Sequence, residues 1–199
     1  MNVQEATTRR LPDLKERHLP ENCRETINTI LKETYGYEQF RNLEIYDDLS
    51  KGKEKLCISQ GQLIENVILE AEKAWKGETQ VDNILLTAPT GSGKSLLFQL
   101  PAIYLGKEYN LLTIVVSPLK ALIVDQVESL QELGYMRVAY ASSDLSPEQK
   151  MEVYRQVREG EIDLFYLSPE LLLSYDIKHF VGERRIGLVV VDEAHPVTT

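Results

Sequence analysis

Hydrophobic residues in the second half of the chain, from about residue 84 onward, fall into short runs separated by longer amphipathic stretches. The runs are mostly continuous Val, Ile, Leu and Tyr, which is typical of strands buried on both faces of a parallel sheet. They predict strands at 84–88, 111–117, 137–142, 163–168 and 187–193. The stretches between them predict helices at 94–105, 119–133, 147–159 and 169–173. This order predicts an α/β fold, with a mostly parallel sheet flanked by helices and right-handed crossovers.

The first 83 residues are more polar, and a helical period replaces the strand pattern. One helix is predicted within 19–36, bounded by Pro20 and Gly36. Its apolar positions share one face: Cys23, Ile27, Ile30 and Leu31. A second helix is predicted at 62–75, with Leu63, Val67 and Ala71 in register. The segment 42–59 lacks a clean period and is interpreted as a loop or short irregular insertion. We therefore predict a helical N-terminal region, 1–83, and an α/β lobe, 84–199.

Composition narrows the class of protein without deciding its chemistry. The 199 residues are 43% hydrophobic and 27% charged, as in ordinary globular domains. The chain has no apolar run near the roughly 20 residues of a membrane span, and its start lacks a signal-peptide core, so an intracellular protein is expected. Its two cysteines, Cys23 and Cys57, are too far apart for a CxxC pair, which argues against structural zinc or a disulfide framework. A net charge of −9 argues against broad adhesion to nucleic acid, but not against a narrow phosphate-binding groove.

The stretch 88–95, Ala-Pro-Thr-Gly-Ser-Gly-Lys-Ser, follows one predicted strand and precedes a helix. It matches a Walker A phosphate-binding loop with Ala in place of the first Gly. Gly91 and Gly93 would let the backbone turn its N–H groups inward, while Lys94 reaches the β- and γ-phosphates and the Ser95 hydroxyl ligates Mg²⁺. The predicted ATP-binding residues of this loop are Thr90, Gly91, Ser92, Gly93, Lys94 and Ser95. A glycine-rich turn without a ligand is the competing interpretation.

A second motif closes the last predicted strand, where Asp192, Glu193 and His195 form the sequence Asp-Glu-Ala-His. Ligands of open α/β sheets gather at the carboxyl ends of the strands, so these acids are expected beside the phosphate loop. Asp192 is predicted to hold Mg²⁺, directly or through water, and Glu193 to orient and deprotonate the attacking water. A solvated strand end is the competing interpretation.

Together the two motifs resemble motifs I and II of superfamily 2 helicases, whose motor lobes are RecA-like P-loop NTPase folds. Three further segments are similar to motifs of the RecQ family: 35–41 to its adenine-recognition motif, 115–127 to motif Ia and 165–173 to motif Ib. The resemblance implies an ATP-dependent DNA helicase that acts on single-stranded and partly duplex DNA, with ATP and Mg²⁺ as cofactors. It implies that His195 links the nucleotide site to DNA contacts. In the cell, such a protein would work in the cytoplasm, nucleoid or nucleus.

The adenine motif departs from the family pattern in one respect. Tyr37 would stack on the base and Arg41 would flank it, but an extra stretch follows Arg41 before the glutamine that would read the base edge. Gln62 is the best match for that glutamine, and Gln60 is the competing candidate. The neighbouring aromatic residues would otherwise serve the core.

Motifs Ia and Ib share a Ser-Pro step at the end of a predicted strand, Ser117-Pro118 and Ser168-Pro169. Serine favours the N-cap and proline the first helical position, so two capped helix starts are predicted, each exposing N–H groups. Lys120 adds positive charge near the first of them. The resemblance implies that both starts hold the DNA backbone without reading sequence. Two capped helices without a ligand are the competing interpretation.

The resemblance also implies parts that these 199 residues do not contain, above all a second RecA-like lobe carrying an arginine finger. In the class of fold that the resemblance implies, the strand after motif II lies between the Walker A and motif II strands, so a gap in the sheet or an unusual strand pairing is expected here. We therefore expect an incomplete lobe that binds ATP weakly and does not unwind DNA alone. Two alternatives stay open: a DEAD/DEAH-box RNA helicase, and an ATP- and DNA-binding module without turnover.

Overall fold

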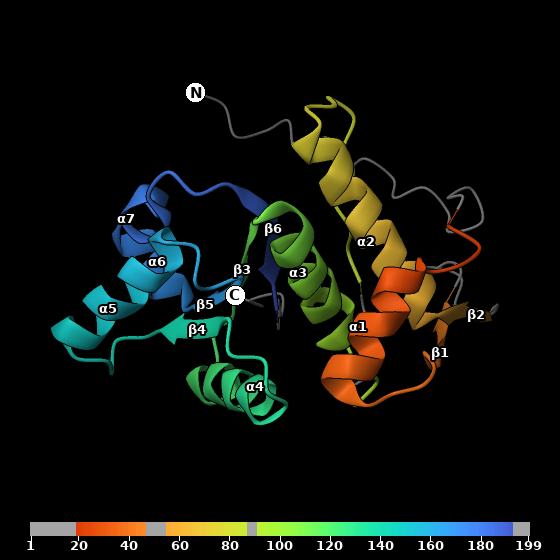
Figure 1. Cartoon of the computed structure of the whole chain (residues 1–199), viewed down its shortest axis with the longest axis horizontal. Coiled ribbons are helices and arrows are strands. Elements are labelled where there is room, and N and C mark those ends of the chain that lie inside the picture. Colours follow the sequence, from red (N-terminus) through yellow and green to blue (C-terminus); the bar gives the residue numbers. More distant parts are fainter. Residues whose placement is uncertain (1–18, 47–54, 87–90, 193–199) are drawn as a thin grey trace, which may run out of the picture.

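The computed structural model describes residues 19–46, 55–86 and 91–192 (Figure 1). In chain order its elements are α1 (Glu25–Tyr35), β1 (Asn42–Tyr46), β2 (Lys55–Ser59), α2 (Gln60–Trp75), α3 (Leu96–Tyr109), β3 (Leu112–Val116), α4 (Lys120–Glu132), β4 (Val138–Ala141), α5 (Pro147–Arg158), β5 (Leu164–Leu167), α6 (Pro169–Ser174), α7 (Ile177–Val181) and β6 (Ile186–Val191). This architecture confirms the predicted α/β fold, because helices flank a parallel sheet.

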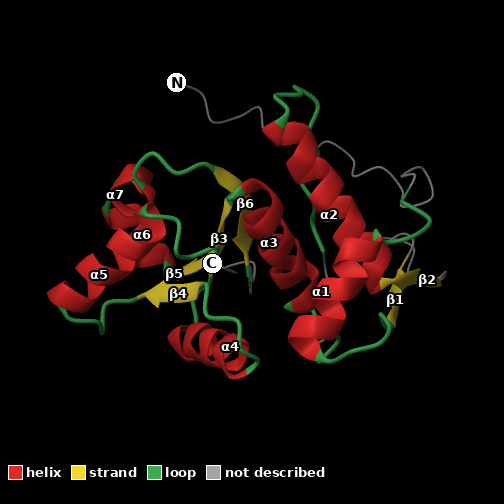
Figure 2. Ribbon diagram, viewed as in Figure 1, coloured by secondary structure: helices red, strands yellow, loops and turns green. Residues whose placement is uncertain are grey.

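The main sheet has four parallel strands in the order β4-β5-β3-β6. The central strands β3 and β5 are fully buried, which explains their uninterrupted apolar sequences. Side chains of one face pack with α3 and α4, including Val115 and Tyr166, while those of the other face pack with α5 and α7, including Ile114 and Phe165. The sheet is thus the middle of three layers (Figure 2).

Helix α3 is the most deeply enclosed helix of the described chain, with every residue from 97 to 106 buried. It contacts α1 and α2 on one side and β3, β5 and β6 on the other, and Figure 1 shows it between these two groups. A helix that is apolar around its whole circumference is stable only when it is surrounded in this way. Each fully buried residue such as Leu100 or Ile103 stabilises the fold by about 1.5–3 kcal/mol relative to exposure.

Two predicted segments are wrong in the structure. Residues 84–86 of the predicted strand 84–88 have no regular secondary structure, and residues 87–88 lie outside the described chain. The segment 42–59, expected to be irregular, contains the antiparallel pair β1–β2, which lies apart from the main sheet in Figure 2. In this pair Leu43 faces Ile58 and both are buried, while Glu44 faces Cys57 and both are exposed. The alternation has a period of two, but five residues a strand are too few to make it obvious from sequence.

Strand β6 forms the outer edge of the sheet in the described chain, and residues 81–86 run alongside it without pairing. Val189 and Val191 on this strand are 58% and 64% exposed, although apolar residues in a parallel strand are normally buried. A cleft therefore separates β6 from 81–86, at the place where the fold resemblance predicted a gap. The predicted boundary between residues 83 and 84 falls within this segment. Helices α1 and α2, before the boundary, share one hydrophobic cluster with α3 and β3, after it, so the core does not divide there and the boundary stays a prediction.

An ion cluster joins the start of α1 to α2 and α3. The Arg24 guanidinium lies 2.6 Å from Glu65 Oε1 and 2.7 Å from Glu72 Oε1, and it donates a hydrogen bond to the Tyr104 hydroxyl. Burial opposes ionisation of Glu72, but hydrogen bonds from Arg24 and Tyr109 outweigh it and hold the pKa of Glu72 below its ordinary value. Glu72 therefore stays ionised, and Arg24 supplies the positive charge next to both carboxylates.

Replacing Arg24 by Ala should lower the free energy of unfolding by about 3 kcal/mol, because it leaves two largely buried carboxylates unpaired. Lys32→Ala is the matched control, since Lys32 pairs with Glu38 at 2.9 Å while both side chains are more than half exposed, and it should cost less than about 1 kcal/mol. Urea denaturation of both variants measures the difference. Equal losses would contradict a structural role for the Arg24 cluster.

Candidate functional site

The described part of the loop before α3, residues 91–95, contains two glycines in the left-handed region of backbone conformation. Gly91 and Gly93 have φ values of +79° and +80°, which L-residues with a side chain rarely adopt. At Gly93 the space is also closed, because a Cβ would lie 2.7 Å from Gln60 Nε2. The predicted residue Thr90 lies outside the described chain. Both positions therefore favour glycine, and the phosphate-binding role of the two residues stays a prediction.

Helix α3 begins at Leu96 rather than at the predicted Lys94, because 93–95 form turns first. The N–H groups of Leu96 and Leu97 donate to the carbonyls of Gly93 and Lys94, at 3.2 and 3.0 Å. Ser95 is the N-cap residue, and its hydroxyl makes no capping hydrogen bond. This leaves the Ser95 oxygen available to a ligand at the positive end of the helix dipole.

Asp192 lies at the carboxyl end of the sheet. Its N–H donates to the carbonyl of Val116 at 2.9 Å, which continues the β3–β6 ladder by one residue beyond β6. The parallel pairing with β3 thus places Asp192 at the edge of the sheet that faces the pocket also lined by Lys94. The other predicted acid and its histidine, Glu193 and His195, lie outside the described residues.

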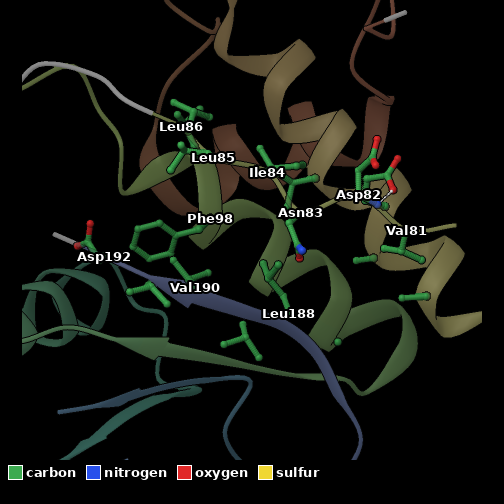
Figure 3. A pocket seen from close by; sticks show the side chains of 18 of the residues that line it. Val81, Asp82, Asn83, Ile84, Leu85, Leu86, Phe98, Leu188, Val190 and Asp192 are labelled. Atoms are coloured by element: carbon green, nitrogen blue, oxygen red, sulfur yellow. Dashed lines mark hydrogen bonds between the residues drawn. The ribbon is translucent and has the colours of Figure 1, made fainter. Parts of the chain in front are cut away.

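Lys94 and Asp192 line the same pocket, which has a volume of about 540 Å³. Most of the pocket is the apolar cleft beside β6, and Figure 3 shows Asp192 at one end of that cleft and Val81 at the other. Phe98, Leu188 and Val190 form part of its wall (Figure 3). Among the described residues that line the pocket, Lys94 supplies an ammonium group and Asp192 a carboxylate, two of the groups that a magnesium-bound phosphate needs.

The two glutamine candidates of the adenine motif have different surroundings. Gln60 is 2% exposed, and its Nε2 donates to the Ser92 carbonyl at 3.1 Å while its Oε1 accepts from the Arg41 N–H at 3.2 Å. Gln62 closes the capping box of α2 by accepting from the Ser59 N–H, and its Nε2 donates to the Pro20 carbonyl. The geometry therefore places Gln60 against the phosphate loop and commits the Gln62 amide to the helix start.

Tyr37 and Arg41, the other adenine candidates, are both exposed. The Tyr37 ring stacks with Tyr35, with the ring centroids 6.3 Å apart and the planes inclined by 18°. Arg41 is joined to the loop through its main chain, since its carbonyl accepts from the Gln60 N–H at 2.9 Å. Both side chains are thus on the surface next to the segment that contacts Ser92.

Of the two predicted Ser-Pro helix starts, one is confirmed and one is wrong. Ser168 caps α6 by accepting from the Leu171 N–H at 3.3 Å, with Pro169 as the first helical residue. Ser117 does not cap α4, because its N–H donates to the Leu167 carbonyl at 3.1 Å and keeps it in the β3–β5 ladder.

The reason for the difference lies in the residues between Ser117 and α4. Leu119, with φ −101° and ψ 99°, is extended, so the helix begins only at Lys120 and Pro118 precedes it as a spacer. The Ser117 hydroxyl is buried and has no hydrogen-bond partner among the described residues. The sheet register nevertheless puts Ser117 beside the start of α6, so the two motifs form one continuous edge.

Positive charge at this edge is partly neutralised. The Lys120 ammonium lies 3.0 Å from Asp144 Oδ1 and also donates to the Ser143 hydroxyl. The hydrogen bond and charge of Lys120 hold the pKa of Asp144 below its ordinary value. Lys120 therefore has an acidic partner with which a phosphate would have to compete.

Sequence reasoning missed Gln99, a buried residue of α3 that contacts three other elements. The signal was present, because Gln99 is the one polar side chain in the run from residue 96 to 103. Within the described ranges, no three His, Cys, Asp or Glu side chains form a cluster able to hold a metal ion. None of the helices in the described part of the chain has the length and apolar character of a membrane span.

Comparison with known proteins gives the chain its family. The DEAD/DEAH box helicase family model matches residues 62–199. The chain is 34% identical over 175 residues to ATP-dependent DNA helicase Q-like 5 of Arabidopsis thaliana and 33% identical over 174 residues to ATP-dependent DNA helicase RecQ of Synechocystis. These matches cover 87% and 86% of this chain but only 16% and 30% of the relatives.

Among solved structures, the UvsW helicase from bacteriophage T4 matches 90% of this chain and 53% of its own, with a TM-score of 0.51 and 16% identity, which supports the fold alone. The family match extends over more than half of the chain and includes both Lys94 and Asp192. The chain therefore belongs to the DEAD/DEAH box helicase family, and its curated relatives include RecQ-type DNA helicases.

Proposed function

We propose that this chain forms the ATP-binding part of a RecQ-type DNA helicase motor. The observation that carries the proposal is that Lys94 and Asp192, which are distant in sequence, line one pocket at the carboxyl end of the sheet. Ligands of open α/β sheets bind at this edge. The left-handed glycines of the loop and the uncapped helix start at Ser95 support the same location for a triphosphate.

Each residue has a distinct role in the proposed site. Lys94 would hold the β- and γ-phosphates, Ser95 and Asp192 would hold Mg²⁺, and Glu193 would orient and deprotonate the attacking water, with His195 linking this site to DNA contacts. A magnesium ion bound there would neutralise charge that develops on the phosphate oxygens. The oxygen donors of Ser95 and Asp192 suit that ion, since Mg²⁺ prefers hydroxyl, carboxylate and phosphate oxygens.

The base would lie next to the N-terminal region. Tyr37 presents an exposed ring for stacking, and Arg41 lies on the surface beside Gln60. Of the two glutamines, we favour Gln60 for reading adenine, because it contacts Ser92 of the phosphate loop. The amide of each glutamine already has two hydrogen-bond partners and would exchange one of them for the base.

The nucleic acid would lie along the edge formed by Ser117, Pro118, Lys120, Ser168 and Pro169. Contacts there would go to sugar and phosphate, so binding would be independent of base sequence. The relatives named as DNA helicases favour DNA over RNA as the partner. The chain spans less than a third of their length, and unwinding would need a second RecA-like lobe with its arginine finger. We propose that the 199 residues alone bind nucleotide weakly and do not unwind DNA. Inside the cell they would act as part of a DNA-directed motor.

The nucleotide site is tested by Lys94→Ala, with binding of a fluorescent ATP analogue in the presence of Mg²⁺ as the readout. Loss of a charge-assisted contact worth about 1.5–3 kcal/mol predicts roughly a 10- to 150-fold weaker affinity. Lys107→Ala, at the exposed far end of the same helix, is the matched control and should bind like the wild-type chain. Equal affinities of the two variants would remove the basis for the proposed site.

The adenine assignment is tested by comparing Gln60→Ala with Gln62→Ala in competition binding of ATP and GTP. Gln60→Ala should reduce the preference for ATP over GTP, because the amide beside Ser92 is lost. Gln62→Ala should leave that preference intact and lower the free energy of unfolding by about 1 kcal/mol through loss of the capping box. The assignment is wrong if the preference disappears only in Gln62→Ala.

The proposed DNA edge is tested by titrating single-stranded DNA at several salt concentrations. Lys120→Ala should weaken binding and reduce the slope of log K against log salt by about 0.7, as expected when one phosphate contact is lost. Asp144→Asn should have the opposite effect on affinity, because it releases Lys120 from its carboxylate partner. An RNA strand of the same sequence provides the comparison for the RNA-helicase alternative. Unchanged DNA affinity in both variants would place the nucleic acid elsewhere.

A further inference from the structure

Gln99 is a buried amide whose hydrogen bonds reach three other elements. Its Oε1 accepts from the Tyr35 hydroxyl of α1 at 2.8 Å. Its Nε2 donates to Gln126 Oε1 of α4 at 2.7 Å and to the Tyr166 hydroxyl of β5 at 3.2 Å. The Gln99 side chain therefore connects α1, α3, α4 and β5. We call the four hydrogen-bonded residues, Tyr35, Gln99, Gln126 and Tyr166, the Gln99 junction.

The junction leaves little freedom to rearrange. An amide nitrogen has two hydrogens, and both are used here by acceptors on different elements. Gln99 is only 5% exposed, so a displaced partner would not be replaced freely by bulk water. Burial raises the pKa of both Tyr35 and Tyr166, so their hydroxyls stay protonated at neutral pH. The four elements are held in the one relative position that satisfies all three bonds.

Each element of the junction also contains, or ends next to, a residue of the proposed sites. The Gln99 N–H donates to the carbonyl of Ser95 at 2.9 Å, one helical turn from the phosphate loop. The Tyr35 ring stacks on Tyr37, the residue proposed to face the base. On the nucleic-acid side, Gln126 belongs to the helix that begins at Lys120, and Tyr166 lies two residues before Ser168.

We propose that Gln99 is a positioning residue that couples nucleotide binding to nucleic-acid binding. A shift of the start of α3 on binding a triphosphate would stretch the bonds to Gln126 and Tyr166, so α4 and β5 would have to follow. By thermodynamic linkage, nucleic acid at the α4–β5 edge would then change nucleotide affinity by the same factor. This inference rests on the proposed function, because it assigns a coupling device to the same two sites.

The test measures a coupling factor on the full 199-residue chain. The dissociation constant for single-stranded DNA is determined with and without Mg²⁺ and a non-hydrolysable ATP analogue, and the reverse titration must return the same factor. The wild-type chain should show a factor in the common range of about 5–150. Gln99→Leu keeps the size of the side chain and removes its hydrogen bonds, so its coupling factor should fall to near one. Its separate affinities for DNA and nucleotide should change less than the coupling, which a merely structural role would not produce.

Two further variants keep the proposal testable if Gln99→Leu fails to fold. Tyr166→Phe and Gln126→Leu each remove one bond donated by the Gln99 amide, and each should lower the coupling factor at least severalfold. Tyr154→Phe is the control, because it also removes a hydroxyl from a buried tyrosine, but in the hydrophobic cluster on the other face of the sheet. It should leave the coupling factor unchanged.

The outcomes separate this inference from the proposed function. Wild-type coupling retained in Gln99→Leu, or in both partner variants, overturns the inference. Measurable binding of both ligands by the wild-type chain with a coupling factor of one also overturns it and leaves the proposed function standing. Failure of the wild-type chain to bind either ligand overturns the proposed function, and the inference falls with it.

Discussion

The enclosure of α3 is the constraint on which the rest of the structure depends. A helix with no polar face must be covered on every side, and here the sheet covers one side and α1 and α2 cover the other. The N-terminal helices are therefore needed by the α/β part of the chain, whatever else they contribute. Because α3 cannot turn or slide independently of its neighbours without exposing apolar surface, the packing fixes the position of the loop at its start relative to those neighbours.

Electrostatics divides the proposed site into two unequal parts. At the loop, positive charge comes from one lysine, two backbone turns and a helix start, which is sufficient for a compact phosphate group. At the α4–β5 edge, the cation Lys120 is already paired with Asp144 in a chain whose net charge is −9. A nucleic acid must therefore be recognised locally by groups that it can share or displace, rather than by a general field around the molecule.

The cleft beside β6 explains why a strongly apolar segment failed to form a strand. Residues 84–86 have the composition of a buried strand, but a strand is stable only when neighbouring backbone groups pair with it. In the described chain no strand lies close enough to 84–86 to provide that pairing, so Leu85 is 67% exposed and the outer edge of β6 stays open. An apolar run thus indicates the tendency to form a strand, and the neighbours decide whether it does.

Local sequence patterns determined the positions of most secondary-structure elements in the α/β part of the chain. Continuous apolar runs placed β3, β4, β5 and β6, the Ser168-Pro169 step placed the start of α6, and the glycines of 91–93 indicated a left-handed turn, because each depends on residues close in the chain. Tertiary structure decided what depends on distant partners. It brought Lys94 and Asp192 to one pocket and placed Gln60 against Ser92. It also held Ser117 in the sheet instead of at the cap of α4, and it surrounded Gln99 with hydrogen-bond partners from three elements. The physical reason is that a polar side chain acquires its role from the groups that fill its hydrogen-bonding capacity, and these come together only when the chain has folded.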